Sequence, residues 1–462
     1  MRPVLTPAEM AAVDARAPEP TAVLVARAGQ AVARAALGLL GGGYGRRVVV
    51  VAGKGNNGAD GRDAARRLAR RGVRVSVVAA AEAPLPLPAC DLVVDAAYGT
   101  GFHGAYVAPD PAGAPVLAVD IPSGVDGTTG AAAEAAVWAR ATVAFAALKP
   151  GLLLHPGRQR AGSVAVADIG LDVSGAACFV VEPGDVGAWL PARDPEAHKW
   201  QSAVVVAAGS AGMQGAAALC TAGAQRAGAG IVVAAVPGAT GQVGADEVIT
   251  RPVPAEGWAA AVLEALGRAR ALVVGPGLGR AEATAAAVRH VVARAPVPVV
   301  VDADGLWALG EGAQAATVIA DRRHPTVLTP HAGEFARLAG SPPDQDRLAS
   351  ARALAERLGA VVLLKGSTTV VADPGGPTLV STAGGPRLAT AGTGDVLAGV
   401  IAAFLARGVA PARAAAAAAV AHGLAARRGP AEGLVAGDVV RHLPTVLAPD
   451  TEARRGGVAG DG

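Results

Sequence analysis

The sequence has few aromatic residues and few cysteines. Only 3% of its 462 residues are Phe, Trp or Tyr, so side chains on which nucleic-acid bases could stack are scarce. The formal net charge is only +3 and no long basic run occurs, which also argues against nucleic-acid binding. The cysteines Cys90, Cys178 and Cys220 lack CxxC spacing, and such a sparse, odd set argues against a disulfide framework and against structural zinc.

The sequence also shows no pattern typical of a targeting segment or a membrane-spanning segment. The N-terminus, MRPVLTPAEMAAVDARAPEP, contains acids and prolines instead of the apolar core of a signal peptide. Apolar stretches such as ARAAAAAAVAHGLAARRG are rich in alanine and broken by glycine or charged residues, unlike a membrane span. We therefore expect a soluble cytoplasmic protein with no membrane partner.

Valine-rich runs, separated by Ala/Arg-rich helical stretches, are abundant and form two series. The runs cover residues 48–53, 73–80, 91–97, 115–122, 142–148 and 162–170, and then 203–209, 230–238, 271–277, 296–305, 326–334 and 360–367. Continuous Val/Ile/Leu runs are typical of parallel strands buried on both faces, and the chain is too long for one core. We predict two α/β three-layer sandwiches, a Rossmann-like domain at 1–190 and a second domain at 191–450, without an internal repeat. The polar tail 451–462 is predicted to be disordered.

A glycine-rich loop, GKGNNGADG, follows the first run at residues 53–61. It satisfies G-x-G-x-x-G through Gly53, Gly55 and Gly58, and such glycines let the backbone approach a phosphate at a helix N-terminus. The adjacent Asn56 and Asn57 are not part of the dinucleotide-binding fingerprint. They either contact a polar ligand or cap the following helix, and the local sequence leaves both interpretations open.

Two aspartates close later runs of the first half. Asp95 precedes AAYGTGFHG and Asp120 precedes IPSGVDGTTG, so both fall at carboxyl ends of expected parallel strands, where open α/β sheets bind ligands. Asn57, Asp95 and Ser123 together offer hard oxygen ligands for a cation. Lys149 is conspicuous because this half has little other lysine. It is either a site residue or an exposed lysine before a proline.

The motifs GKGNNGADG, VDAAYGTGFHG, VDIPSGVDGTTG and ALKPGLLLHPGR, in this order, resemble the NAD(P)H-hydrate epimerase family over roughly residues 5–172. Ala59 departs from the family, which usually has another glycine there. The resemblance implies a potassium site at Asn57, Asp95 and Ser123, and a proton-handling catalytic role for Asp120. It also implies contacts to the hydrated nucleotide from Asp120 and from Asn56, Asn57, Gly58, Ala59, Asp60, Gly99, Thr100, Gly101, Phe102, His103, Gly104 and Ala105.

The densest signal of the second half is TAGTGDVLAG at residues 390–399. It opens an apolar helix, and the N–H groups of Gly392, Thr393 and Gly394 would face a bound anion with the helix dipole behind them. There is no GK[ST] sequence, so this is not a P-loop. Asp395 at the helix start is either an N-cap or a catalytic carboxylate.

Other polar loops follow the remaining runs of this half. They are the glycine-rich segments 208–217 and 275–279, the acids of 300–306, the pair His331 and Glu334, and Lys365 with its hydroxyl neighbours. Five such loops at one sheet edge are what a cleft for a nucleotide and a second substrate requires. His331 alone would more often be structural, but in this set we expect it to contact substrate.

GTGD, KGxxT and GPGLG together resemble the ribokinase-like fold. Six motifs in order, from HKWQSAVVVAAGSAGMQGAA to TAGTGDVLAGVIAAFLARG, resemble the ADP-dependent NAD(P)H-hydrate dehydratase family over roughly residues 196–445. Trp200 and Gln201 replace small residues of that family. The resemblance implies substrate contacts at Ala216, Gly277 or Gly279, His331 and Asp395. It implies nucleotide contacts at Lys365, Gly366, Ser367, Thr368, Thr369 and Gly394, and magnesium as in other phosphoryl transfers.

Taken together, the resemblances imply a bifunctional cofactor-repair enzyme. The first domain would interconvert the R and S forms of hydrated NADH and NADPH, and the second would dehydrate the S form with ADP, giving NAD(P)H, AMP and phosphate. Asp395 would be the general base that activates the ring hydroxyl toward a phosphoryl group held by the 392–394 amides. We expect a homo-oligomer. The alternative is a ribokinase-like kinase for a vitamin-precursor alcohol, fused to a Rossmann-like module that binds without catalysing.

Overall fold

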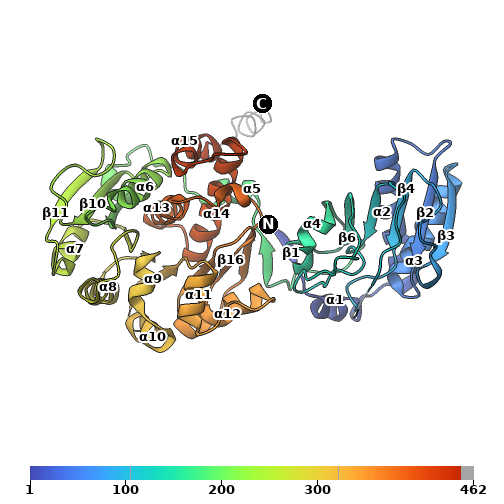
Figure 1. The fold of residues 1–462 in the computed structure, drawn as a ribbon, viewed down its shortest axis with the longest axis horizontal. Helices are drawn as coiled ribbons and strands as arrows, with labels where there is room; N and C mark the ends of the chain where they lie inside the picture. Colours follow the sequence, from blue (N-terminus) through green and yellow to red (C-terminus); the bar gives the residue numbers. More distant parts are fainter. Residues whose placement is uncertain (103, 105, 321, 449–462) are drawn as a thin grey trace, which may run out of the picture. The chain divides into compact units, whose positions relative to one another are not determined.

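The structure is a computed structural model and describes residues 1–102, 104, 106–320 and 322–448 (Figure 1). The predictions for His103, Ala105 and the tail 451–462 lie outside these residues. The chain divides into two compact units, one of residues 2–179 and one that begins at Val180 and includes Met1. Both are α/β units, which confirms the predicted fold class.

The N-terminal unit is built on a parallel sheet with the strand order β3-β2-β4-β5-β6-β7. Its strands are β2 (Arg47–Ala52), β3 (Arg74–Ala79), β4 (Leu92–Ala96), β5 (Val116–Val119), β6 (Ala141–Phe145) and β7 (Ser163–Ala167). Each coincides with a predicted run. The chain passes from β2 outward to β3 and then back to β4, so the order reverses between β2 and β4. Ligands of open α/β sheets bind at such a switch point.

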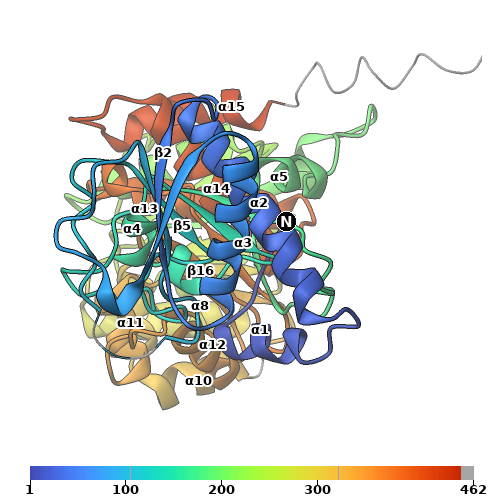
Figure 2. The same cartoon turned by 90° about the vertical axis from the view of Figure 1, so that its right-hand side faces the viewer.

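Helices cover one face of this sheet, as Figure 2 shows for α2 and α3. The helices of the unit are α1 (Pro7–Asp14), α2 (Thr21–Leu40), α3 (Asn56–Arg70) and the short α4 (Gly157–Ala161), with 3-10 turns at 80–82 and 150–152. Met10, Val32 and Leu68 from the first three helices are buried against the Val48 and Val50 side of the sheet. The opposite face packs against loops instead.

The helix α2 is long and apolar enough to cross a membrane by length and composition. In the structure it packs as a core helix, because Ala28, Val32, Ala36 and Leu40 are buried in the same cluster as the sheet. The prediction that no segment is a membrane span therefore agrees with how this helix packs.

The C-terminal unit has a mixed sheet with the order β17-β16-β15-β14-β13-β12-β9-β10-β11. Its strands are β9 (Ala203–Ala207), β10 (Ile231–Pro237), β11 (Ile249–Val253), β12 (Ala271–Val274), β13 (Val299–Val301), β14 (Thr326–Leu328), β15 (Val361–Leu364), β16 (Thr369–Ala372) and β17 (Thr378–Ser381). Pairing is parallel from β11 to β15 and antiparallel at β16 and β17. The short β1 (Arg2–Val4) begins the N-terminal unit, and β8 (Cys178–Val180) spans the chain boundary between the units.

Helices lie on both faces of this second sheet (Figure 1). They are α5 (Pro183–Trp189), α6 (Gln214–Arg226), α7 (Ala259–Leu266), α8 (Glu282–Arg294), α9 (Asp304–Leu309), α10 (Gly312–Ala320), α11 (Ala332–Ala339), α12 (Arg347–Leu358), α13 (Thr393–Ala406), α14 (Pro411–Arg428) and α15 (Ala436–Leu447), with 3-10 turns at 199–202 and 386–388. Two glycines let α6 and α13 touch. A Cβ on Gly399 would lie 2.0 Å from the Cys220 carbonyl oxygen, and one on Gly223 would lie 2.4 Å from that of Val396.

Candidate active sites

The first polar cluster lies at the carboxyl ends of β4 and β5. Asp95 is buried, with 2% of its surface exposed, and its carboxylate accepts the backbone N–H (2.8 Å) and the hydroxyl (2.7 Å) of Ser123. The Ser123 hydroxyl in turn accepts the N–H of Tyr98 at 2.9 Å. Burial raises the pKa of Asp95 to about 6, against the opposing effect of the Ser123 hydrogen bonds. The structure thus brings together two of the three predicted cation ligands.

The third predicted ligand, Asn57, lies in the first turn of α3. Gly55 is the N-cap and no side chain caps the helix, so the interpretation of the asparagines as caps is wrong. The side-chain oxygen and nitrogen of Asn57 are buried and have no hydrogen-bond partner among the described residues. Gly99 is next to it, since a Cβ there would lie 3.5 Å from the Asn57 Cβ. A buried amide without partners is costly, and a ligand that binds this side chain would offset that cost.

Asp120 follows β5 and has a left-handed backbone, with φ = 66°. Such a conformation is strained for aspartate and often occurs at functional sites. Its carboxylate accepts the ammonium group of Lys149 at 2.5 Å, which also donates to the Phe145 carbonyl oxygen at 2.9 Å. Lys149 is only 1% exposed, so its interpretation as an exposed lysine is wrong.

Asp60 and Asp14 lie within electrostatic reach of Asp120. Burial, and then the charges of Asp120, Asp63 and Asp14, raise the pKa of Asp60 to about 8. Burial and Asp120 likewise raise the pKa of Asp14. At neutral pH this edge of the N-terminal sheet therefore contains a protonated carboxyl group, that of Asp60. It belongs to the same electrostatic cluster as the Asp120–Lys149 ion pair.

The loop that follows Asp95 is held by aromatic packing. The rings of Tyr98 and Phe102 are 4.3 Å apart and those of Tyr98 and Tyr106 are 5.0 Å apart, and the Phe102 N–H donates to the Gly99 carbonyl at 3.1 Å. Gly99 also adjoins Asn57. The predicted contacts at Thr100, Gly101 and Gly104 lie on this loop, and their roles stay predictions.

The C-terminal unit has a corresponding cluster at the ends of β13, β14 and β15. Asp302 is buried and accepts the Lys365 ammonium at 2.7 Å and the Thr329 hydroxyl at 2.7 Å. The Lys365 nitrogen also lies 3.7 Å from a Glu334 oxygen. Burial alone would lower the pKa of Lys365, but the Asp302 and Glu334 carboxylates raise it. Lys365 is therefore a cation held between two acids.

The start of α13 lies against this ion pair. A Cβ on Gly394 would be 3.5 Å from the Lys365 nitrogen and 3.7 Å from an Asp302 oxygen. Gly392 is the N-cap, with no side-chain cap hydrogen bond, and Asp395 lies in the first turn, so the N-cap interpretation of Asp395 is wrong. Burial and then Asp302 raise the pKa of Asp395 to about 7, against the opposing effect of Lys365.

A buried histidine of α14 fixes the same turn. His422 Nε2 lies 2.9 Å from the Thr393 carbonyl oxygen, and burial lowers the pKa of His422 to about 4. The ring is therefore neutral at pH 7, with its Nε2–H directed to that carbonyl. The Thr393 hydroxyl donates to the Leu388 and Thr390 carbonyls, which holds the preceding loop to the helix.

The predicted substrate contacts of this unit lie at the start of α6, in the loop after β12 and at the N-cap of α11. A Cβ on Gly277 would lie 2.9 Å from that of Ala216, so these two residues are neighbours, while the Gly279 N–H donates to Asp304 at 3.0 Å. His331 caps α11 through Nδ1, and its side chain is 61% exposed. The capping contact does not involve Nε2, and contact with substrate stays a prediction.

The predicted nucleotide-binding residues Lys365, Gly366, Ser367 and Thr368 connect β15 to β16, and Thr369 is the first residue of β16. Thr368 is buried, and the Thr369 hydroxyl donates to the Gly366 carbonyl at 3.4 Å. Arg347, which the sequence did not single out, donates to the Lys365 carbonyl at 3.1 Å. A second cation therefore adjoins this turn.

Comparison with known proteins identifies the family of each half of the chain. Residues 204–446 match a family described as NAD(P)H-hydrate dehydratase, and residues 21–86 and 79–151 match the YjeF-related protein N-terminus. The chain is 41% identical over 472 residues to the bifunctional NAD(P)H-hydrate repair enzyme of Mycobacterium leprae, covering 93% of this chain and 95% of the relative. This chain belongs to the family of bifunctional NAD(P)H-hydrate repair enzymes. It is accordingly an NAD(P)H-hydrate epimerase and dehydratase in one chain.

Other members and one solved structure extend this result. The NAD(P)H-hydrate repair enzyme of Mycobacterium tuberculosis is 42% identical over 410 residues, covering 81% of this chain and 82% of the relative. A crystal structure of a ribokinase-like superfamily protein from Enterococcus faecalis matches with 22% identity and a TM-score of 0.52, covering 59% of this chain and 95% of the other. The second match confirms the ribokinase-like fold.

Several residues of the two clusters were not among the predicted site residues of this repair enzyme, and Asp302, Lys149 and Asp14 are examples. Asp302 was visible only as one of two acids after a strand, Lys149 only as an isolated lysine, and Asp14 gave no signal at all. All three join the sites through burial and charge contacts with residues far along the chain.

Proposed function

We propose that the two units repair hydrated NAD(P)H in succession. The N-terminal unit interconverts the R and S forms, and the C-terminal unit dehydrates the S form with ADP, releasing NAD(P)H, AMP and phosphate. The observation that carries the proposal is the Asp395 carboxylate in the first turn of α13, beside the Lys365–Asp302 ion pair.

In the dehydratase site, Asp395 is the general base. With a pKa of about 7, it is partly ionised at neutral pH and basic enough to take the proton of the ring hydroxyl. The hydroxyl oxygen then attacks the terminal phosphorus of ADP, and AMP leaves. The N–H groups at the start of α13 and the Lys365 ammonium stabilise charge on the transferred phosphoryl group.

Elimination completes the dehydration. The C–O bond of the phosphorylated ring breaks and phosphate leaves with the bonding electrons, because phosphate is a far better leaving group than hydroxide. The departing phosphate takes up the proton of the adjacent carbon, which restores the ring double bond. Ala216, Gly277 and His331 surround the ring in this proposal, and Gly366–Thr369 with Gly394 contact ADP.

In the epimerase site, Asp120 and Asp60 handle the protons. The hydroxyl must leave one face of the ring carbon and return to the other, which requires an acid and a base. Asp60, protonated below about pH 8, is suited to protonate the departing hydroxyl. The Asp120 carboxylate, paired with Lys149, is suited to activate the returning water. Asn56–Asp60 and Gly99–Ala105 hold the nucleotide.

Two cations accompany the proposal. The residues present fit potassium, because the Asn57 amide oxygen has no partner in the described part of the chain and Asp95 and Ser123 add carboxylate and hydroxyl oxygens. The Asp302 carboxylate provides a hard oxygen ligand beside the expected phosphates, which fits magnesium. Magnesium would supply charge neutralisation on the phosphates, and potassium would order the substrate loops.

A coupled assay tests the proposal. Purified protein is given hydrated NADH with ADP, with ATP or with no nucleotide, and the return of the reduced-nicotinamide absorbance is followed together with free phosphate. We expect ADP-dependent recovery with one phosphate per NADH. A stable phosphorylated product in place of free phosphate would instead identify a small-molecule kinase, and no ADP-dependent recovery would refute the proposed reaction.

A further inference from the structure

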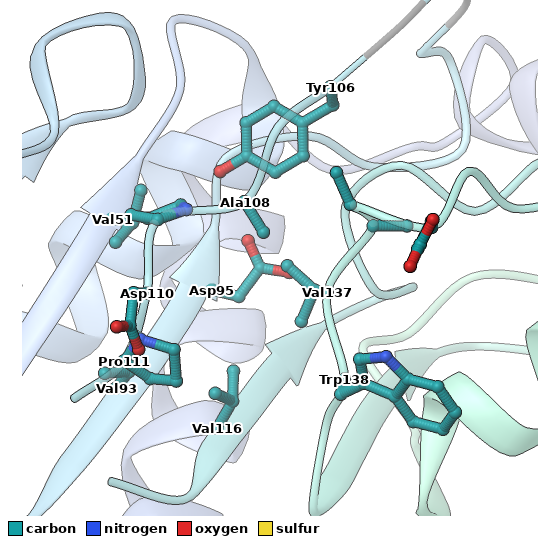
Figure 3. Close-up of a pocket in the computed structure, with 14 residues that line it drawn as sticks. Val51, Val93, Asp95, Tyr106, Ala108, Asp110, Pro111, Val116, Val137 and Trp138 are labelled. Atoms are coloured by element: carbon teal, nitrogen blue, oxygen red, sulfur yellow. The ribbon is translucent and has the colours of Figure 1, made fainter. Parts of the chain in front are cut away.

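The loop-covered face of the N-terminal sheet contains a cavity of 290 Å³ (Figure 3). The connection from β4 to β5, residues 97–115, forms no helix in its described part, although parallel strands are usually joined by a helix that covers the sheet. Val51, Val93 and Val116 line the cavity from the strands. Its size is near the lower end of the about 300–1,000 Å³ typical of ligand pockets, so it suits a molecule with a single ring.

The walls of the cavity are tied together by hydrogen bonds. The Ala108 N–H donates to the Ala135 carbonyl at 2.9 Å, which joins the two loops that form the walls, and the Val137 N–H donates to Ser123 at 3.0 Å. The Arg160 guanidinium donates to three carbonyls of the second loop and stacks 4.1 Å over the Trp138 ring. The cavity is therefore preformed, which lowers the cost of binding.

One polar group in the wall lacks a partner. Tyr106 is 8% exposed, and its hydroxyl is buried without a hydrogen-bond partner among the described residues. Figure 3 shows this hydroxyl directed toward the side of the cavity where Val51 and Asp95 lie. Burial and the charge of Asp95 raise the pKa of Tyr106, so the phenol stays neutral and its oxygen can accept a hydrogen bond. An unpaired buried hydroxyl is costly, and a ligand N–H would remove that cost.

The charged side chains that line the cavity are all acidic, and the Arg160 guanidinium packed behind its wall is engaged by backbone carbonyls. Its ionisable carboxyl groups are Asp95 at the inner end and Asp110 and Glu134 at the exposed loops, and no lysine or arginine among the described residues lines it. The Asp95 oxygens are already engaged by Ser123, so Asp95 contributes charge more than direct contact. The remaining wall is mostly valine, alanine and proline, with Trp138 60% exposed at the rim. A negative, mostly apolar cavity favours a cation with an apolar body.

We propose that this cavity binds a small organic cation, namely a protonated primary amine on a single-ring apolar body. The ammonium group donates to the Tyr106 hydroxyl within the field of the three carboxylates, and the ring packs on Val93, Val116 and Val137. The site lies on the face of the sheet, its recognition does not involve Asp120 or Asn57, and it shares only Asp95 with the predicted potassium site.

Three probes of the same size but different charge test the class of ligand. Benzylamine, benzyl alcohol and benzoate are titrated into the full-length protein in buffer containing potassium chloride, and binding is followed by calorimetry and ligand-observed NMR. We expect benzylamine to bind at one site, benzyl alcohol to bind about fivefold more weakly, and benzoate not to bind. Because potassium is present throughout, occupancy of the predicted potassium site is held constant.

Variants locate the binding. Tyr106→Phe should weaken benzylamine about 2- to 12-fold, the range expected for one hydrogen bond, and Ala108→Leu should abolish binding by filling the cavity. Tyr44→Phe is the matched control, since Tyr44 is fully exposed, and should change nothing. Glu134→Gln should weaken benzylamine and leave benzyl alcohol unchanged.

Several results would overturn the proposal. They are no binding of benzylamine, equal binding of benzyl alcohol, or binding that both Tyr106→Phe and Ala108→Leu leave intact. If a second copy covers this face instead, benzylamine will not bind and Trp138→Ser will dissociate the oligomer in sedimentation. None of these readouts depends on repair activity, so failure of this proposal and failure of the proposed function can be told apart.

Discussion

Asp395 is the residue whose surroundings most directly determine its chemistry. Its pKa of about 7 means that it loses its basic form below neutral pH. We therefore expect kcat/KM for dehydration of the S form to fall about tenfold for each pH unit below 7 and to level off above it. Initial rates measured between pH 5 and 9 would show this limb, and a profile flat through pH 7 would exclude Asp395 as the base.

Substitution of the same residue provides a second measure of this prediction. Asp395→Asn keeps the shape of the side chain but removes its basicity, and should lower kcat about 10²- to 10⁴-fold. Asp246→Asn is the control because Asp246 is exposed.

Lys149 is the second residue with a clear physical consequence. It is buried against Asp120 and the Phe145 carbonyl, and removing one partner of a buried ion pair typically costs about 3–5 kcal/mol. Lys149→Met should therefore lower the unfolding temperature of the N-terminal unit in calorimetry and abolish consumption of the R form. Lys199→Met, at an exposed lysine, should do neither. An active, fully stable Lys149→Met protein would contradict the role given to the pair.

At the scale of elements, the buried strands were the most predictable part. Runs such as VVVV in β2 and LVV in β4 have no polar face because both sides are covered. The strands β1, β8, β11, β16 and β17 were not predicted. β16 follows directly after the polar turn Gly366–Thr368 and pairs with β15 in the antiparallel direction. This pairing depends on tertiary contacts, which a short apolar run in the sequence does not reveal. Likewise, α3 begins at Asn56, inside the segment interpreted as a loop, which gives Ala59 an ordinary helical backbone.

The candidate sites were predictable to the extent that glycines and acids mark strand ends. Glycines and acids of this kind mark Asp95, Asp120 and Asp395 in the sequence. The structure places each of the three at the expected edge. The partners Lys149 and Asp302 were not predicted as site residues, because burial and ion pairing join segments that are remote in sequence.

The contact between α6 and α13 gives a prediction for an element. A Cβ on Gly399 would lie 2.0 Å from the Cys220 carbonyl oxygen, so Gly399→Ala must push the helices apart, at a cost of about 1–3 kcal/mol. Because α13 carries Asp395, we expect a lower unfolding temperature and a loss of dehydration together. Gly437→Ala in α15 has open space around it and should be neutral or slightly stabilising. Equal behaviour of the two variants would show that this close packing does not position the site.

At the scale of the whole molecule, each site is built from residues of its own unit. The intermediate that links them, the S form of the hydrated nucleotide, is a complete small molecule that can pass through solution. A chain with Asp120→Asn should therefore repair the S form at the normal rate and fail on the R form. A chain with Asp395→Asn should fail on both.

Mixing these two variants tests whether the units work independently. Because one variant retains the epimerase and the other the dehydratase, the mixture should regain repair of the R form, and the rate should rise with the concentration of the Asp120→Asn chain. The double variant in one chain, at the same total concentration, is the control and should stay inactive beyond spontaneous epimerisation. A mixture that repairs the R form no faster than that control, while the S form is still repaired, would show that the intermediate does not pass through solution. The intermediate must then be transferred between the two sites within one assembly.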